Sequence, residues 1–153
     1  MRARGFTLVE LMIAVAILAI IAAVAMPLYT QYSLRTFRSG GQADLLDCAQ
    51  GMERFAARNF SYQGAADTDG DGIGDANAGP VAAEICTPDS AAAGRYTFTV
   101  NAPDANTFTL TATPDGQMAA NNDGFMTYDS AGVRGWDQDN SGGIDAAEQT
   151  WEE

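Results

Sequence analysis

The chain has 153 residues and a net charge of −12, with 20 acidic residues against eight basic ones. This length predicts one modest domain beyond any membrane segment, and the acidity disfavours direct nucleic-acid binding through bulk charge, because phosphates would be repelled. The sequence has no histidine, which removes the commonest general base and metal ligand. The acidity instead suggests binding of divalent cations, or solubility in a salty exterior.

A basic leader and a long apolar segment open the chain. Arg2 and Arg4 precede 24 residues, 6–29, whose one charged side chain is Glu10. About 20 apolar residues suffice for a helix to cross a membrane, and the positive-inside rule would send the rest of the chain outward. A cleaved signal peptide is the alternative, because residues 23–25 are small enough for a cleavage site.

Glu10 is the unusual residue of this segment. An acid inside a membrane helix costs about 2.5–3.5 kcal/mol and is usually functional, which argues against a conventional signal peptide. The run Thr7–Glu10 also matches a capping box, in which Glu10 would bond the first N–H groups of the helix and suit its dipole. From these residues alone, the capping role and a functional role both stay open.

The run Gly5–Ile13, Gly-Phe-Thr-Leu-Val-Glu-Leu-Met-Ile, resembles the class III signal of type IV pilins, and Met26–Tyr32 is similar to their continuation. The resemblance implies that a prepilin peptidase cuts between Gly5 and Phe6 and that the new amine of Phe6 is then methylated. It also implies that Glu10 pairs with the N-terminal amine of a neighbouring subunit. Physical chemistry agrees, since two charges desolvated in a filament core each need a partner.

The resemblance further implies three parts: a leader over residues 1–5, a transmembrane and polymerisation half of the helix over 6–32, and a globular head over 33–153. The implied partners are further copies of the chain, other pilins, the prepilin peptidase and an inner-membrane assembly machinery. The precursor would lie in the inner membrane and the filament outside the cell. Pro27 predicts a kinked or loosened helix; the resemblance implies a segment that melts on assembly, and a static kink is the alternative.

From Ser33 to about Arg58 the pattern remains helical. Apolar or small residues recur at three- and four-residue steps and predict a stripe that faces the head: Leu34, Phe37, Gly41, Leu45, Cys48, Met52 and Phe55. Gly40 and Gly41 predict a bend or frayed turn, because a helical glycine costs about 1 kcal/mol relative to alanine. The exposed side chains of this stretch are expected to include Arg38, Asp44, Asp47 and Arg54.

Cys48 and Cys86 are the two cysteines of the chain. An even count in an exported chain favours one disulfide, whereas two free thiols would be expected in the cytosol. Cys48 lies on the apolar stripe of the helix, where it could bridge to a covering loop. That loop is predicted over residues 59–94, with a short helical turn near Pro80–Ile85. So long a loop needs a tie, which the bridge or a bound cation could provide.

Alternating apolar and threonine residues predict strands at 96–100 and 107–112, because this pattern suits an antiparallel sheet with one wet face. Residues 123–130 predict a third strand, and 131–135 predict a short fourth. Turns are expected at 101–106 and 114–122. The predicted fold is therefore α+β: a long N-terminal helix packed on a small antiparallel sheet, with a long αβ loop and a C-terminal calcium-type loop.

An acidic loop over residues 137–148 resembles an EF-hand calcium loop. Oxygen ligands fall at positions 1, 3, 5, 7, 9 and 12, which are Asp137, Asp139, Ser141, the carbonyl of Gly143, Asp145 and Glu148. Calcium takes six to eight such oxygens, and the final glutamate can supply two. Serine departs from the usual Asp or Asn at position 5, although its hydroxyl can coordinate. No clear helix precedes the loop, so the prediction is an isolated EF-like loop.

A second acidic loop carries a related but incomplete pattern, which also resembles thrombospondin type 3 calcium repeats. Its ligands would be Asp67, Asp69, Asp71, the carbonyl of Ile73, and Asp75. Its twelfth position is Ala78, so a distant carboxylate or a water would have to supply the missing oxygen. Solvated acidic turns are the alternative for both loops, because Asp and Gly are common in surface turns. A bound Ca²⁺ would have a structural role.

The leading interpretation is a structural subunit of a type IV pilus, major or minor, serving motility, adhesion or DNA uptake. A pseudopilin of a type II secretion system is the closest alternative, although the Tyr29–Tyr32 run and the two cysteines favour a pilin. A secreted calcium-binding module is a third possibility. Catalysis is not expected, since the sequence offers no histidine and no nucleophile–base constellation.

Overall fold

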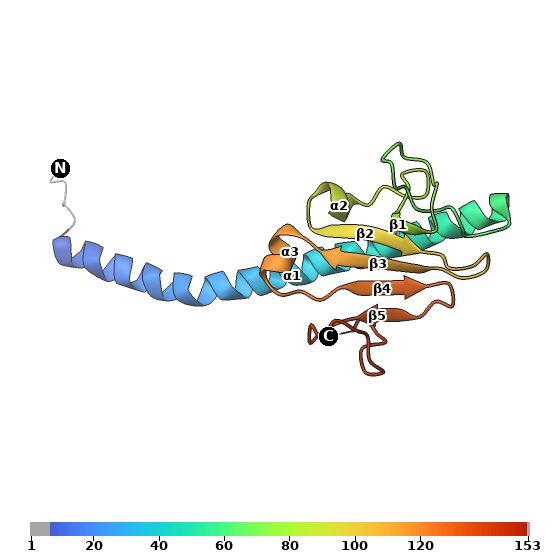
Figure 1. Ribbon diagram of the computed structural model, residues 1–153. Helices are drawn as coiled ribbons and strands as arrows, with labels where there is room; N and C mark the ends of the chain where they lie inside the picture. The colour runs from blue at the N-terminus through green and yellow to red at the C-terminus, as the bar shows by residue number, and fades with distance from the viewer. Residues whose placement is uncertain (1–6, 153) are drawn as a thin grey trace. The chain divides into compact units, whose positions relative to one another are not determined.

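The computed structural model describes residues 7–152. The chain divides into two compact units, one up to Thr36 and the other from Phe37 onward, and each is described by itself. Helix α1, Leu8–Asn59, contributes residues to both units (Figure 1). It is long because its sequence is rich in alanine and leucine, which have high helix propensity, and carries a single internal proline.

In the first unit, α1 exposes its apolar side chains. All residues from Thr7 to Tyr29 are exposed, and length and composition alone would let this helix cross a membrane. The helix is continuous through Pro27, which has no N–H to donate to the carbonyl of Ala23. One turn later the Thr30 hydroxyl donates to the Met26 carbonyl at 3.1 Å, a type of bond that often bends helices.

The second unit packs α1 on a five-stranded antiparallel sheet. The strands are β1 (Ala78–Pro80), β2 (Tyr96–Asn101), β3 (Thr109–Pro114), β4 (Met126–Asp129) and β5 (Arg134–Trp136). They follow one another in chain order across the sheet, each paired with the next. The predicted α+β fold is confirmed.

The core lies between the helix and one face of the sheet. The helix buries Gly41, Leu45, Cys48, Ala49, Gly51, Met52 and Phe55, which confirms the predicted stripe from Gly41 onward. Along β2 and β3 the buried side chains are Tyr96, Phe98, Val100, Leu110 and Ala112. Most of the intervening threonines face outward and are exposed or half-buried, as the alternation predicts.

Three short elements differ from the sequence prediction. A helical turn is predicted near Pro80–Ile85, but Pro80 is the last residue of strand β1. The turn is confined to Ala82–Cys86, where Ile85 N–H donates to the Ala82 carbonyl at 2.9 Å. Helix α2 (Asp89–Ala92) precedes β2, and helix α3 (Gly116–Ala120) occupies the expected turn at 114–122. The third and fourth strands are shorter than predicted. These short elements depend on neighbours for their hydrogen bonds, so local sequence carries little signal for them.

Arg38 was predicted to be exposed, but it is held against the sheet. Its Nη2 donates to Asp123 Oδ1 at 2.6 Å, and its guanidinium lies 3.8 Å from the centre of the Trp136 ring. The Tyr96 hydroxyl donates to the other oxygen of the same carboxylate. Burial together with this bond to Asp123 raises the pKa of Tyr96 far above its ordinary value. Asp44, also expected to be exposed, is half-buried.

The two adjacent glycines of α1 have different surroundings, and neither interrupts the helix. A Cβ on Gly41 would lie 2.9 Å from Tyr96 Cε2 and 2.9 Å from Met126 Cε, whereas a Cβ on Gly40 would meet Ser90 Oγ at an ordinary 3.6 Å. Gly41 therefore permits close packing of the helix against the sheet. The predicted bend is absent, and this close packing is the reason that a glycine occupies the position.

This contrast yields a matched prediction. Gly41→Ala is expected to destabilise the chain by about 1–3 kcal/mol through overpacking, despite the better helix propensity of alanine. Gly40→Ala should raise stability by about 0.5–1 kcal/mol, because a helical glycine is replaced without a clash. Thermal unfolding of the two variants in parallel, followed by circular dichroism, checks both signs. Equal shifts in the two variants would contradict the close-packing explanation.

Candidate functional site

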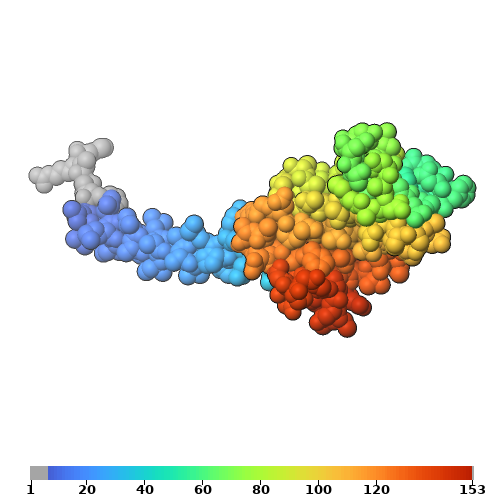
Figure 2. All heavy atoms as spheres, in the orientation of Figure 1, coloured from blue at the N-terminus to red at the C-terminus, as the bar shows by residue number. Residues whose placement is uncertain are grey.

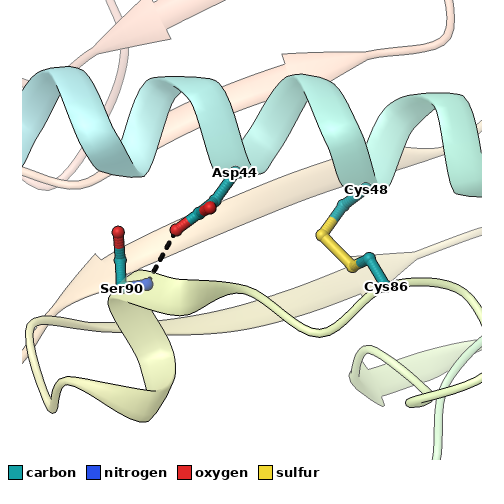
Figure 3. The surroundings of a disulfide bond; sticks show 4 residues. All are labelled: Asp44, Cys48, Cys86 and Ser90. Carbon is teal, nitrogen blue, oxygen red and sulfur yellow. Dashed lines mark hydrogen bonds between the residues drawn. A yellow bond between two sulfur atoms is a disulfide. The ribbon is translucent and has the colours of Figure 1, made fainter.

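The long loop after α1 is tied to the helix by a disulfide. Cys48 and Cys86 are bonded, with their Cα atoms 5.0 Å apart, so the predicted bridge is confirmed. One helical turn before Cys48, Asp44 Oδ2 accepts the N–H of Ser90 at 2.8 Å (Figure 3). The loop also approaches the helix at Gly51, where a Cβ would lie 2.3 Å from the Ile85 carbonyl oxygen. These contacts fix the path of the loop after its acidic stretch 67–75.

The first acidic loop folds around its own carboxylates. Asp67 accepts the N–H groups of Gly70 and Gly72 at 2.7 and 2.8 Å. These bonds, the one from Gly70 foremost, lower the pKa of Asp67. One carboxylate oxygen each of Asp67, Asp69 and Asp71 lies within 4.8 Å of the others. Three of the predicted acids are thus brought together.

Asp75, a further predicted ligand, lies outside this group of three carboxylates. The Asp75 carboxylate accepts the N–H and hydroxyl of Thr68 at 3.0 Å. The sequence does not identify the distant carboxylate that would supply the missing oxygen of this loop. In the structure, Glu84 is a candidate for that role. Its Oε1 accepts the N–H of Gly74 at 3.0 Å, and its own N–H donates to the Gly72 carbonyl. No local pattern marks this residue, because the fold alone brings it to the loop.

The C-terminal acidic loop gathers the first, third and twelfth predicted ligands. Oxygens of Asp137, Asp139 and Glu148 lie within 4.8 Å of one another. Asp137 is 2% exposed and Glu148 is 7% exposed. Carboxylates buried to this extent are normally paired or bound to a metal, so their burial distinguishes this loop from an ordinary solvated turn.

The hydrogen bonds to these carboxylates come from the loop itself. Asp137 Oδ1 accepts the N–H of Ser141 at 2.9 Å, and Glu148 Oε1 accepts the N–H of Gln138 at 2.8 Å. Hydrogen bonds from Ser141 lower the pKa of Asp139. The Ser141 hydroxyl lies 3.4 Å from the Gly143 carbonyl oxygen. The arrangement presents a row of carboxyl and carbonyl oxygens, which is the donor set that Ca²⁺ prefers.

Asp145, the predicted ligand at position 9, lies outside the group of three carboxylates. Its Oδ1 accepts the N–H groups of Ala147 and Glu148 at 2.7 and 3.2 Å. It thereby shapes the turn that delivers Glu148 to the cluster. In EF-type loops the ninth residue often acts through a water molecule, so this position is compatible with the expected pattern.

The C-terminal loop and tail cover the last strand of the sheet. The N–H of Trp136 in β5 donates to the Glu148 carbonyl at 3.0 Å, and the N–H of Asp137 donates to the Phe125 carbonyl at 3.0 Å. The Trp151 indole donates to the Gly135 carbonyl at 3.0 Å. The acidic cluster is therefore built directly onto the edge of the sheet, and ordering of the loop should influence that edge.

The start of α1 carries the predicted assembly acid. The N–H of Glu10 donates to the Thr7 hydroxyl oxygen at 3.2 Å, and the N–H of Leu11 donates to the Thr7 carbonyl at 3.2 Å. Thr7 thus caps the helix, while the Glu10 side chain is exposed. The predicted cleavage after Gly5 and methylation of Phe6 lie outside the described residues.

Comparison with known proteins gives matches over most of the chain. Residues 27–124 match the family model described as "Type IV minor pilin ComP, DNA uptake sequence receptor", and residues 1–26 match the "Prokaryotic N-terminal methylation motif". The chain is 36% identical over 110 residues to the type IV major fimbrial protein FimA of Dichelobacter nodosus, which covers 71% of this chain and 58% of FimA. It is 61% identical over 33 residues to a fimbrial protein of Pseudomonas aeruginosa, 22% of this chain and 21% of that protein.

Proposed function

This chain belongs to the type IV pilin family, and we propose that it is a structural subunit of a type IV pilus, polymerising through its apolar N-terminal helix. The observation that carries the proposal is the exposure of every residue from Thr7 to Tyr29 on one continuous helix. Such a surface is unstable in water. A membrane would cover it before assembly, and the helices of other subunits would cover it in the filament core.

Glu10 and the amine of Phe6 would supply the polar contact of this assembly. After cleavage between Gly5 and Phe6, the new amine of one subunit would meet the Glu10 carboxylate of its neighbour. Two charges paired in an apolar core interact strongly, whereas either one alone is heavily penalised. One acid per subunit would therefore also set the axial register of the filament. Pro27 would provide the weak point at which the helix can bend during assembly.

The test is a deletion strain combined with N-terminal sequencing of the mature chain. Loss of surface fibres on deletion, restored by the gene, together with a methylated Phe6 as first residue, would support a pilin. A mature chain beginning at Met26 would instead support a secreted module. Intact fibres accompanied by a loss of protein secretion would support a pseudopilin. The ratio of this chain to other pilins in purified fibres would assign it as a major or a minor subunit.

The filament would serve motility, adhesion or DNA uptake, and the relatives bear on this choice. The matching family model names a DNA uptake sequence receptor, while the relatives from D. nodosus are named major fimbrial proteins. The chain spans 58% of the length of FimA. From Phe37 onward it carries five arginines against nineteen acids, a balance that opposes phosphate binding. We therefore favour a structural subunit over a direct DNA receptor.

We further propose that the C-terminal acidic loop binds a structural Ca²⁺. Asp137, Asp139 and Glu148 would ligate it, with Ser141 and the Gly143 carbonyl beside them and Asp145 acting through water. The support is the short separation of the three carboxylates and the burial of two of them. The same chemistry is proposed for the loop of Asp67, Asp69 and Asp71, with Glu84 as the distant carboxylate.

Calcium is expected to stabilise the full chain in detergent. At a free concentration 100 times the dissociation constant, stabilisation should be about 2.7 kcal/mol, a rise in melting temperature of roughly 10 °C. Glu148→Gln should remove most of this rise, because it removes a charge from the cluster. Glu152→Gln removes the same charge nearby, outside the cluster, and should leave the rise intact. An equal melting temperature in calcium and in chelator would contradict the proposal.

A further inference from the structure

The last turns of α1 carry two arginines without partners. Arg54 and Arg58 are exposed, and neither makes an ion pair, hydrogen bond or ring contact with any residue from 7 to 152. The other arginines of the second unit are engaged: Arg38 pairs with an aspartate, and Arg95 and Arg134 lie over aromatic rings at 3.9 and 5.1 Å. On so acidic a surface, two adjacent unpaired cations mark a place where an anionic group from outside can bind.

An exposed aromatic residue lies immediately beyond these arginines. Phe60 is 91% exposed and has a φ of +55°, a left-handed conformation that is an outlier for a bulky residue. Such strain costs of the order of 1–3 kcal/mol and tends to occur at functional positions. The Phe60 ring is 91% exposed, which leaves it available for a contact outside the isolated chain.

The surface between the two arginines is concave. Arg54, Ala57 and Arg58 line an open groove together with Glu84 from the following loop. In Figure 2 the end of α1 lies at the surface beside this loop. The groove therefore offers two guanidinium groups against the one carboxylate of Glu84, with an apolar ring beyond its end.

We propose that this patch, formed by Arg54, Ala57, Arg58 and Phe60, docks the acidic loop 67–75 of a second copy of the chain. The inference rests on the proposed filament, which brings copies together. Loop 67–75 exposes three acids, Asp69, Asp71 and Asp75, and between the last two Ile73 is 58% exposed. The run Asp69, Asp71, Ile73 matches two guanidinium groups followed by an aromatic ring in both charge and order.

A second copy fits the patch better than a nucleic acid does. A polyanion would have two arginines to bind and the many acids of the head to repel it. Copies of a chain with a net charge of −12 repel one another, so close packing requires specific contacts that offset the repulsion. Loop 67–75 also remains negative if it holds one divalent cation, because it carries four aspartates.

The direct test places a photo-crosslinking amino acid at Phe60 in the full chain and irradiates purified fibres. We expect a dimer whose cross-linked peptide contains residues 67–75 of the other copy, identified by mass spectrometry. A cross-link within one chain, to another segment, or to nucleic acid would overturn the inference, as would no cross-link in intact fibres. Complete absence of the chain from fibres would instead overturn the proposed function.

Charge changes provide the second test. Arg54→Asp with Arg58→Asp should reduce the yield of fibres at least fivefold. Arg54→Gln with Arg58→Gln should reduce the yield of fibres. The control, Gln117→Glu with Gln149→Glu, changes the net charge by the same amount outside the patch and should leave the yield of fibres unchanged. Melting temperatures of all variants control for folding. Equal yields from the two charge-matched pairs would overturn the inference.

Discussion

Glu10→Val is expected to abolish fibres while the precursor accumulates in the membrane. We expect a loss of fibre-associated chain of more than tenfold, measured by immunoblotting of sheared fibres and of membranes. The apolar substitution should not impair insertion, because an acid in this segment costs about 2.5–3.5 kcal/mol. What the variant loses is the partner of the neighbouring subunit's amine, which would then be buried without an opposite charge.

Thr7→Val separates this role from helix capping. The Thr7 hydroxyl accepts the N–H of Glu10 at 3.2 Å, and its loss should cost the helix about 1 kcal/mol while leaving the Glu10 carboxylate in place. Fibres should therefore persist in Thr7→Val and disappear in Glu10→Val. If both variants lose fibres to the same extent, Glu10 acts mainly through the helix start, and the intersubunit pair must be abandoned.

Removing the disulfide is expected to have the largest effect on the stability of the second unit. The double variant Cys48→Ser, Cys86→Ser opens a loop whose ends are 38 residues apart. Chain entropy for a loop of this size predicts a loss of about 4 kcal/mol, which is a large share of the 5–15 kcal/mol typical of a domain. The melting temperature should fall by roughly 15 °C, and protease should cut the loop sooner.

Asp44→Ala is the matched comparison, because it removes the other tie between the same loop and helix. Asp44 accepts the N–H of Ser90 at 2.8 Å, one turn from the bridge (Figure 3). Loss of one hydrogen bond should cost about 1–2 kcal/mol, clearly less than loss of the disulfide. Similar melting temperatures for the two variants would show that the covalent link contributes little beyond local contacts.

Local sequence patterns were sufficient to predict the parts of this protein in which apolar residues recur at a regular spacing or the composition is unusual. The apolar segment and the stripe from Gly41 to Phe55 follow directly from side-chain spacing. The same spacing predicts the strands at 96–100 and 107–112, and the structure has them at 96–101 and 109–114. The pairing of the cysteines followed from their even number and from Cys48 lying on that stripe. The acidic loops could be located because calcium-type spacing places oxygens at fixed intervals, and three carboxylates of each loop do lie together.

Contacts between distant segments decided the rest. Strand β1 exists because β2 offers it hydrogen bonds, and Glu84 reaches the first acidic loop only through the path that the disulfide helps to fix. Arg38 is turned inward because Asp123, 85 residues later, is buried within reach of its guanidinium. The sequence by itself determined which segments are helix, strand and acidic loop, since those depend on neighbours in the chain. The tertiary structure alone decided which carboxylates are buried and which arginines remain unpaired, because burial and ion pairing depend on residues brought together across the fold.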